Sequence, residues 1–181
     1  MRYVVIFTGA IWAVFQYTEH VREQKVSAVL RYQKDLRTSP LFESWRRVAI
    51  SNIENTKEQR DAQRKGGLSW LQYSISLAMK NRDDIELIVA FFNELRDCMQ
   101  EGVCDKDAAV NMFGQEATDF YTFYGGYISC ERVVSGDDTF ASGVTSLRDE
   151  LFWRQHWFSQ LTRRPAGILS PTRLECAQLD R

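Results

Sequence analysis

The feature that most constrains this chain is a run of apolar, uncharged residues close to its amino terminus. The run extends from Tyr3 to Tyr17 and reads YVVIFTGAIWAVFQY, in a chain of 181 residues of which 26% are charged. An α-helix rises about 1.5 Å per residue, so this run spans about 22 Å as a helix. The hydrocarbon core of a bilayer is about 30 Å thick and usually takes about 20 residues to cross. The segment is therefore short for a membrane crossing, although its composition suits one.

Three interpretations of this run compete. The first is a secretory signal peptide, for which Arg2 supplies the basic start, but residues 14–17 (VFQY) lack the small residues of a cleavage site. The second is a helix buried inside a soluble bundle. The third is a single membrane anchor over residues 1–20. We favour the anchor, because Trp12 and the tyrosines at both ends of the run suit the two membrane interfaces.

The charged residues are unevenly distributed, and their positions favour one orientation of such an anchor. Residues 19–37 contain five basic and three acidic residues, whereas Arg2 is the one charged side chain before the run. Because positive charge is retained on the cytoplasmic side, we expect a single-pass protein of the cell inner membrane with the bulk of the chain in the cytoplasm. The predicted membrane contacts are Tyr3, Trp12, Tyr17, Arg22 and Lys25.

The composition excludes several other classes of protein. With 44% apolar and 13% aromatic residues and only 3 prolines, the chain is not disordered. A mean hydropathy of −0.36 excludes a polytopic membrane protein. The net charge of −1 offers no general argument for a nucleic-acid partner, and none is expected.

Beyond the apolar run, the spacing of hydrophobic residues is helical almost throughout. This pattern predicts an all-α fold, an up-down helical bundle preceded by a long amino-terminal helix. The predicted divisions are a transmembrane anchor (1–20), an amphipathic juxtamembrane helix (21–38), a cytoplasmic bundle (39–162) and an irregular tail (163–181).

Local signals predict where several helices begin and end. Pro40 suits the first turn of a helix, which we expect to run without a break to Lys65 and to stop at the glycine pair that follows. Residues 68–79 fit a helix or a short strand, and their helical neighbours favour a helix. Asp83, with Glu86 three residues later, resembles a capping box at the start of the next helix.

The second half of the chain carries further boundary signals. Gly102 predicts the end of one helix, and Asp105 predicts the start of the next. The pair Gly125-Gly126 indicates either a kink or a close approach to another helix. We expect a loop over residues 135–143 and a last helix over residues 144–161.

The sequence shows no arrangement of residues that indicates catalysis. The cysteines have no CxxC spacing and are expected to be free thiols in a reducing cytoplasm, although Cys98 and Cys104 flank the turn at Gly102. A zinc site needs two further ligands, and His20 and His156 are far from that pair. We therefore expect no metal, no cofactor and no enzymatic activity.

Residues 152–158 (FWRQHWF) form the best candidate for a partner-binding surface. Neighbouring aromatic residues in a helix cannot all face one core, so some of them are expected on the surface. The alternative is a helix that simply packs against the bundle. The predicted partner-binding residues are Phe152, Trp153, His156, Trp157 and Phe158.

Several short motifs occur in an order that resembles a known family. They are REQK (22–25), SPLFESWR (39–46), FFNEL (91–95), EGVCD (101–105) and FYxxY (120–124). This order resembles that of a bacterial family of membrane-anchored, all-helical proteins known only as a domain of unknown function. The resemblance implies a helical cytoplasmic domain behind an amino-terminal anchor. It implies no activity and no catalytic residue.

These patterns together predict a membrane-anchored helical protein that acts through protein–protein interaction. Residues 3–17 are expected to bind inner-membrane lipid, and the bundle is expected to bind a partner protein or a second copy of the chain. Two alternatives remain open. One is a membrane-perturbing effector or toxin, such as an antiphage effector. The other is a soluble helical adaptor with a buried first helix.

Overall fold

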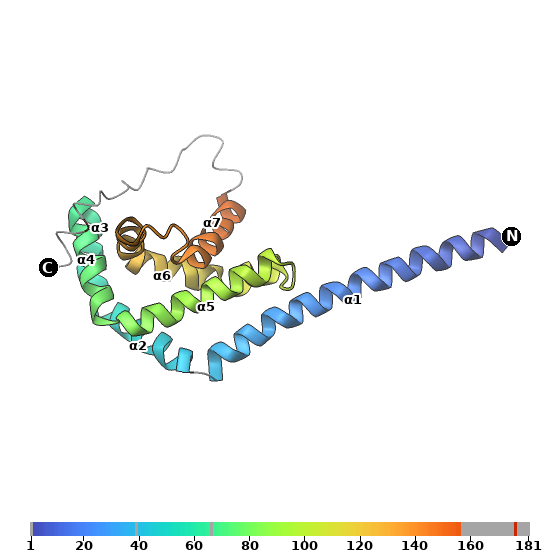
Figure 1. The fold of residues 1–181 in the computed structure, drawn as a ribbon, viewed down its shortest axis with the longest axis horizontal. Helices are drawn as coiled ribbons and strands as arrows, with labels where there is room; N and C mark the ends of the chain where they lie inside the picture. Colours follow the sequence, from blue (N-terminus) through green and yellow to red (C-terminus); the bar gives the residue numbers. More distant parts are fainter. Residues whose placement is uncertain (1, 39, 66, 157–175, 177–181) are drawn as a thin grey trace.

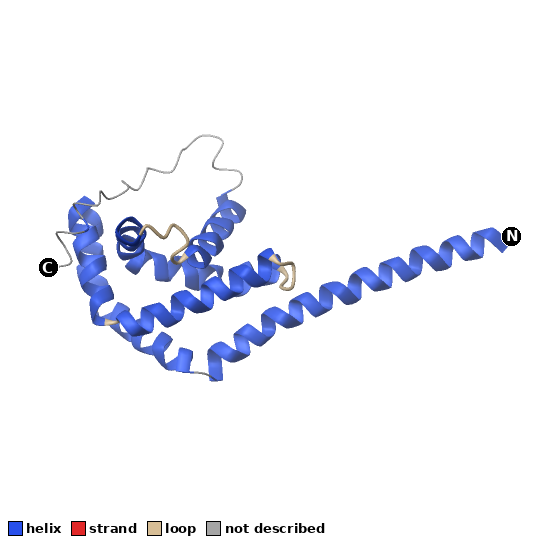
Figure 2. Ribbon diagram, in the orientation of Figure 1, coloured by secondary structure: helices blue, strands red, loops and turns tan. Residues whose placement is uncertain are grey.

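The computed structural model describes residues 2–38, 40–65, 67–156 and 176, and all secondary structure within these ranges is α-helical (Figure 2). The prediction of an all-α protein is therefore confirmed. Residues 68–79 are helical, as favoured from the sequence, and the predicted tail (163–181) lies outside the described residues except for Cys176. The helices are α1 (Arg2–Thr38), α2 (Pro40–Glu54), α3 (Thr56–Lys65), α4 (Gly67–Lys80), α5 (Arg82–Gln100), α6 (Lys106–Ser135) and α7 (Ser142–His156).

Helices α2 to α7 pack together, and α1 extends from them as a long rod (Figure 1). Helix α6 lies beside α4 and α7, and helix α5 lies beside α2 and α7. The carboxyl-terminal half of α1 joins this group, because Val29 is fully buried and Tyr32 and Leu36 are partly buried against the core. Residues 12–20 of the same helix are exposed. One continuous helix thus combines a packed carboxyl-terminal half with an exposed stretch over residues 12–20.

Aromatic side chains of α5 and α6 form the centre of the core. Phe92, Phe113 and Tyr124 are at most 2% exposed. The ring of Phe91 meets that of Phe113 edge-on with centroids 5.5 Å apart, and the rings of Phe120 and Tyr124 lie 4.9 Å apart. Aromatic pairs of this kind contribute about 0.5–1.5 kcal/mol each beyond the area that they bury. This cluster is therefore a major source of the cohesion between α5 and α6.

Two further helices attach to the same aromatic cluster. Tyr32 of α1 packs edge-on against Phe91, with ring centroids 5.9 Å apart. Trp45 of α2 packs edge-on against Phe92 at 5.8 Å and stacks on Phe120 at 6.2 Å. The helices that precede residue 55 are thus held by rings that lie far from them in the sequence.

The unbroken helix predicted after Pro40 is wrong, because a turn at Asn55 separates α2 from α3. The Asn55 side-chain amide donates to the Ser51 carbonyl at 2.6 Å, and the Tyr73 hydroxyl donates to the Asn55 carbonyl at 3.1 Å. Such competing hydrogen bonds distort a helix locally. Backbone bonds still run across the junction, from Asn55 to Ser51 at 3.1 Å and from Gln59 to Asn55 at 3.0 Å.

The capping box predicted at Asp83 is also wrong. Helix α5 begins at Arg82, so Asp83 lies in its first turn, and Asn81 is the amino-terminal cap without a side-chain capping bond. The Asn81 amide instead donates to the Ser51 hydroxyl at 3.2 Å. Glu86, the other half of the predicted box, accepts a hydrogen bond from Arg82 at 2.9 Å. Glu86 is therefore occupied elsewhere, and Asp83 lies inside the helix instead of at its cap.

The turn between α5 and α6 forms where the sequence predicts it. Gly102 has φ +70°, a left-handed conformation that suits glycine at the end of a helix. Asp105 is the cap of α6, and its carboxylate accepts a hydrogen bond from the Ala108 amide at 2.8 Å. Both boundary predictions are confirmed, because both depend only on residues close together in the chain.

The prediction that the cysteines are free thiols is wrong. Cys98 and Cys104 form a disulfide across the turn at Gly102, with Cα atoms 5.2 Å apart. Cys130 of α6 and Cys176 form a second disulfide, with Cα atoms 5.3 Å apart. The prediction failed because it took the oxidation state from the expected compartment, and because the second pair is separated by 46 residues in the sequence.

The glycine pair in α6 permits a close helix approach, which was one of its two predicted roles. A Cβ atom on Gly126 would lie 2.8 Å from the Cβ of Ser74 and 3.3 Å from the Cα of Leu71, both on α4. The buried Ser74 hydroxyl uses this proximity, because it accepts a hydrogen bond from the Tyr127 amide at 3.0 Å. Only a residue without a side chain fits between the two helices at this point.

The loop before α7 is shorter than predicted. Helix α6 ends at Ser135, followed by Gly136 with φ +72°, and α7 already begins at Ser142 instead of residue 144. The described part of α7 extends to His156, so the remainder of the predicted helix (144–161) lies outside the described residues.

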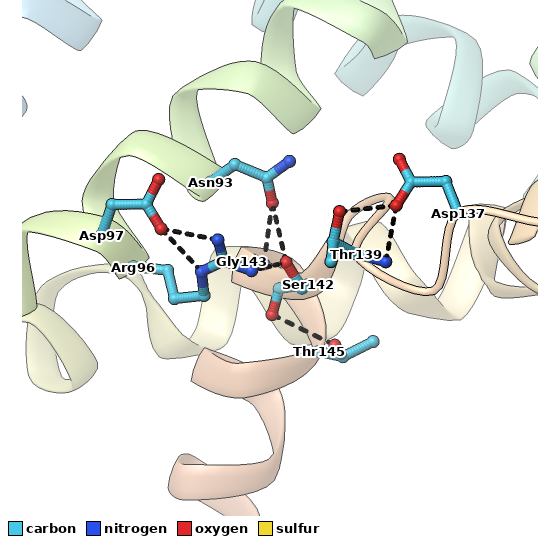
Figure 3. A network of polar contacts seen from close by, with 8 residues as sticks. All are labelled: Asn93, Arg96, Asp97, Asp137, Thr139, Ser142, Gly143 and Thr145. Carbon is cyan, nitrogen blue, oxygen red and sulfur yellow. Dashed lines mark hydrogen bonds and ion pairs between the residues drawn. The ribbon is translucent and has the colours of Figure 1, made fainter. Parts of the chain in front are cut away.

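The start of α7 is held on α5 by a group of polar contacts (Figure 3). The Asn93 side-chain carbonyl accepts hydrogen bonds from the Gly143 amide at 2.9 Å and from the Ser142 hydroxyl at 3.4 Å. Arg96 contacts the Ser142 hydroxyl and pairs with Asp97 at 2.6 Å. The contacts place the backbone of Gly143 directly against α5.

Replacement of Gly143 by alanine is expected to destabilise the protein. A Cβ atom there would collide with the backbone carbonyl of Phe92, which cannot move without displacing α5. We expect Gly143→Ala to lower the free energy of unfolding by about 1–3 kcal/mol, the usual cost of overpacking. The matched control is Ser146→Ala, at an exposed position of the same helix, which should change it by less than about 0.5 kcal/mol. Urea unfolding measures both, and equal stabilities would contradict the expected collision.

Candidate interaction surface

Between Trp12 and Tyr17, helix α1 presents apolar side chains to all sides. Trp12, Val14, Phe15 and Tyr17 are between 60% and 69% exposed. Successive residues of a helix are rotated by about 100°, so these four side chains point in four different directions around the axis. The surface is therefore a belt and not a one-sided stripe. No helix in the described part of the chain combines the length and the apolar character that a membrane crossing requires.

The predicted membrane contacts lie along this rod, and they do not all have the same surroundings. Trp12 and Tyr17 belong to the exposed belt, and Arg22 is exposed one turn further on. Tyr3 lies in α1, but its side chain is outside the described residues. Lys25 is half-buried, and its backbone carbonyl accepts a hydrogen bond from the Asp105 amide at 3.2 Å. The bundle therefore begins to hold α1 at Lys25.

The predicted partner-binding residues lie at and beyond the end of α7. Phe152 and Trp153 are 40% and 55% exposed, as the run of neighbouring aromatic residues suggests. His156 is the last residue of the helix, and its side chain is not among those described. Trp157 and Phe158 lie outside the described residues. The described part of this predicted surface is therefore the pair Phe152 and Trp153.

Ion pairs attach the end of α7 to the start of α6. Arg154 contacts Asp107 at 2.5 Å and Glu150 at 3.6 Å, and Lys106 contacts Glu150 at 2.8 Å. The hydrogen bond from Lys106, together with the charges of Lys106 and Arg154, holds the pKa of the Glu150 carboxyl below its usual value. Phe152 and Trp153 are thus presented by a helix whose last described turn is tied to its neighbour.

The structure does not bring the two predicted surfaces together. Figure 1 shows α5 between α1 and α7, with the amino terminus of α1 directed away from the packed helices. The belt on α1 and the aromatic pair on α7 are therefore two separate surfaces.

A bidentate ion pair links α2 to α5. Arg47 donates two hydrogen bonds to Asp84, Nε to Oδ2 at 2.9 Å and Nη2 to Oδ1 at 2.5 Å. The hydrogen bonds from Arg47, reinforced by one from Ser44, lower the pKa of the Asp84 carboxyl. No local signal identifies Asp84, which lies 37 residues from Arg47.

Two tyrosines contribute their hydroxyl groups to the interior. The Tyr124 hydroxyl donates to the Asn52 side-chain carbonyl at 2.7 Å. Burial raises the pKa of Tyr73 to about 12 and raises that of Tyr124 as well. Both phenols therefore stay protonated and serve as hydrogen-bond donors that join α4 and α6 to α2 and its junction with α3.

The described residues offer little that suits a metal ion or a buried small ligand. Within them, no group of three or more His, Cys, Asp or Glu side chains is placed to hold a metal ion. A shallow groove of about 470 Å³ lies along the junction of α2 and α3. Its lining mixes both signs of charge: Ile53, Glu54, Thr56, Lys57, Arg60, Asp61 and Arg64.

The chain was compared with known proteins in three ways. No family model matches it, and neither a curated protein nor a solved structure is significantly similar to it.

The ion pair between Arg47 and Asp84 predicts a specific dependence of stability on pH. Because the pKa of Asp84 is lowered in the folded state, the pair stabilises the protein above the ordinary aspartate value of 3.8. That contribution is lost as the pH falls through the folded-state value. Because the Arg47 side chain is 56% exposed, the contribution is expected within the range for solvent-screened pairs, about 0.2–1 kcal/mol.

Unfolding by urea between pH 7 and pH 2 tests this dependence. Asp84→Asn should lower stability at neutral pH, and its difference from the natural protein should vanish at the acid end. Asp138→Asn, at an exposed position of the loop before α7, is the matched control and should follow the natural protein throughout. A constant difference for Asp84→Asn over the whole range would exclude the ion pair as its cause.

Proposed function

We propose that this chain is a membrane-attached helical protein that acts through contacts with other proteins. Residues 3–17 form the attachment, and the helices after Pro40 form an up-down bundle that presents a contact surface. The observation that carries the proposal is the exposure of apolar side chains on every side of α1 between Trp12 and Tyr17. The proposal includes the relationship to the bacterial family of unknown function that the order of motifs resembles.

The distribution of these side chains favours lipid over a protein partner for this segment. A partner helix or a groove covers one side of a helix, whereas hydrocarbon surrounds it. Burial of a large apolar side chain is worth about 1.5–3 kcal/mol. A one-sided partner would leave part of the belt formed by Trp12, Val14, Phe15 and Tyr17 in water. Membrane hydrocarbon covers all of it.

The residues that flank the belt are compatible with attachment of a short apolar segment. The Thr18 hydroxyl donates to the Phe15 carbonyl at 2.8 Å, so it needs no water partner at the membrane boundary. His20 and Gln24 share a hydrogen bond of 3.1 Å one turn further on. Bilayers adapt to short segments at a fraction of a kcal/mol per Å of mismatch. Tyr17 and Trp12 are side chains that favour the interface.

A charged residue placed in the belt tests the attachment. We expect Val14→Asp to shift the protein from the membrane fraction towards the soluble fraction, since an aspartate within an inserted segment costs up to about 3 kcal/mol. Val134→Asp is the matched control, because Val134 is also an exposed valine but belongs to the packed helices. Flotation of the purified full-length proteins with lipid vesicles measures the bound fraction. Recovery of the natural protein in the soluble fraction without detergent would contradict the proposal.

The contact surface that we propose is centred on Phe152 and Trp153, and a second copy of the chain is the partner that can be tested directly. Truncation of an interface aromatic residue typically costs more than about 1 kcal/mol, which is at least about fivefold in affinity. We expect Phe152→Ala to weaken self-association by this factor. Phe42→Ala is a closely matched control, because Phe42 is 42% and Phe152 is 40% exposed.

Sedimentation of the detergent-solubilised proteins over a range of concentrations measures this association. A monomeric natural protein, or equal association of both phenylalanine variants, would exclude Phe152 as part of a self-association surface. The membrane flotation test does not depend on this result, so the two parts of the proposal can fail separately.

A further inference from the structure

The two disulfides pair cysteines that are consecutive in the sequence. Cys98 pairs with Cys104, the next cysteine, and Cys130 pairs with Cys176, the next after that. All four are at most 9% exposed. Because no cluster of metal-binding residues exists within the described residues, the sulfur atoms are not assigned to a metal there. Each pair is instead placed to form a covalent link in a different part of the bundle.

The first disulfide closes the turn that supports α1. The backbone amides of Val103 and Cys104 both donate to the Cys98 carbonyl at 3.0 Å, so the turn is tightly wound. The next residue, Asp105, donates its amide to the carbonyl of Lys25 in α1 at 3.2 Å. The disulfide therefore stabilises the place where the exposed half of α1 leaves the packed helices.

The second disulfide attaches residue 176 to the packed helices. Cys176 is 3% exposed. With Cys130, it lines a hollow of about 130 Å³ that also includes Ile75, Met79 and Tyr127. A thiol at this depth is poorly accessible to an oxidant once the chain has folded. The bond must therefore form before or during the final packing of this region.

We propose that residues 98–176 fold in an oxidising compartment, as a substrate of a protein thiol–disulfide oxidoreductase. A thiolate of each pair attacks the disulfide of the oxidised oxidoreductase and forms a mixed disulfide. The second thiolate of the pair then displaces the oxidoreductase. Each cycle forms one disulfide in this chain and transfers two electrons and two protons to the oxidoreductase, which leaves as a dithiol.

Consecutive pairing suits oxidation of a chain that emerges from its amino-terminal end. When Cys104 emerges, Cys98 is the one cysteine with which it can pair, and it lies six residues away. Cys130 then has no thiol partner until Cys176 emerges, because Cys98 and Cys104 are already joined. Simple oxidation in order of appearance thus produces both native bonds, so a disulfide isomerase is not required.

This inference also bears on the orientation of the proposed membrane attachment, and there it rests on the proposed function. Disulfides persist in compartments such as the bacterial periplasm and are rare in the cytoplasm. If residues 3–17 cross the membrane, residues 98–176 lie on the side opposite to the one predicted from the basic residues 22–37. The disulfides and the positive-inside rule therefore predict opposite orientations, which one measurement can separate.

The test measures the thiols of the full-length protein as it exists in cells. Cells are quenched with acid, the protein is denatured, and free thiols are labelled with a polyethylene-glycol maleimide that shifts the electrophoretic band once per thiol. We expect no shift without reduction and a shift of four labels after reduction. Cys176→Ser should gain one label, on Cys130, and Cys98→Ser should gain one label, on Cys104. Because labelling is done on denatured protein, these outcomes do not require the variants to fold.

Two further observations complete the test. In cells that lack the compartment's thiol oxidoreductase, or that grow with a permeant reductant, four labels should appear on the newly made natural protein. Four labels in untreated cells would overturn the inference and favour a reducing compartment. The membrane fraction is measured on the same samples. Oxidised thiols in a protein that does not bind membranes would exclude the attachment alone, and free thiols in a membrane-bound protein would exclude the oxidation alone.

Discussion

The packing of aromatic rings between α5 and α6 is the interaction on which the remaining structure depends. Phe92 and Phe113 are almost completely buried, and the rings around them are close enough to interact edge to face. Helices α1 and α2 each place one ring, Tyr32 or Trp45, on this cluster. Loss of the cluster would therefore weaken the attachment of both α1 and α2, because both helices dock on the same rings.

Close backbone approach and polar pairing then determine how the other helices sit. Gly126 lets α6 touch α4, and Gly143 lets α7 touch α5, each at a point where a side chain would collide with its neighbour. Polar groups at these junctions are satisfied by partners from another helix, as in the bond from the Gly143 amide to Asn93. Arg47 and Asp84 do the same between α2 and α5. Such contacts specify one arrangement, since a shifted helix would leave them unpaired.

The two parts of α1 have different surroundings, and the function that we propose depends on this difference. From Lys25 onwards the helix is held by the turn before α6 and by the aromatic cluster. Between Trp12 and Tyr17, its apolar side chains are exposed and face every direction. A surface of this kind is costly in water. We therefore propose lipid for the belt and protein for the aromatic residues of α7, with disulfides that retain the bundle's shape outside a reducing environment.

The sequence by itself determined the features that depend on neighbours in the chain. Helical spacing predicted the all-α class, and Gly102 and Asp105 predicted a turn, because a glycine's left-handed backbone and a carboxylate cap act within a few residues. The tertiary structure alone decided the pairing of Cys130 with Cys176 and the pairing of Arg47 with Asp84. Each pairing joins residues that are far apart in the sequence. Local sequence patterns do not predict which distant side chain will be in contact. Trp12 and Phe152 combine both kinds of information. The sequence shows that they are apolar, but only the folded structure shows that they are exposed.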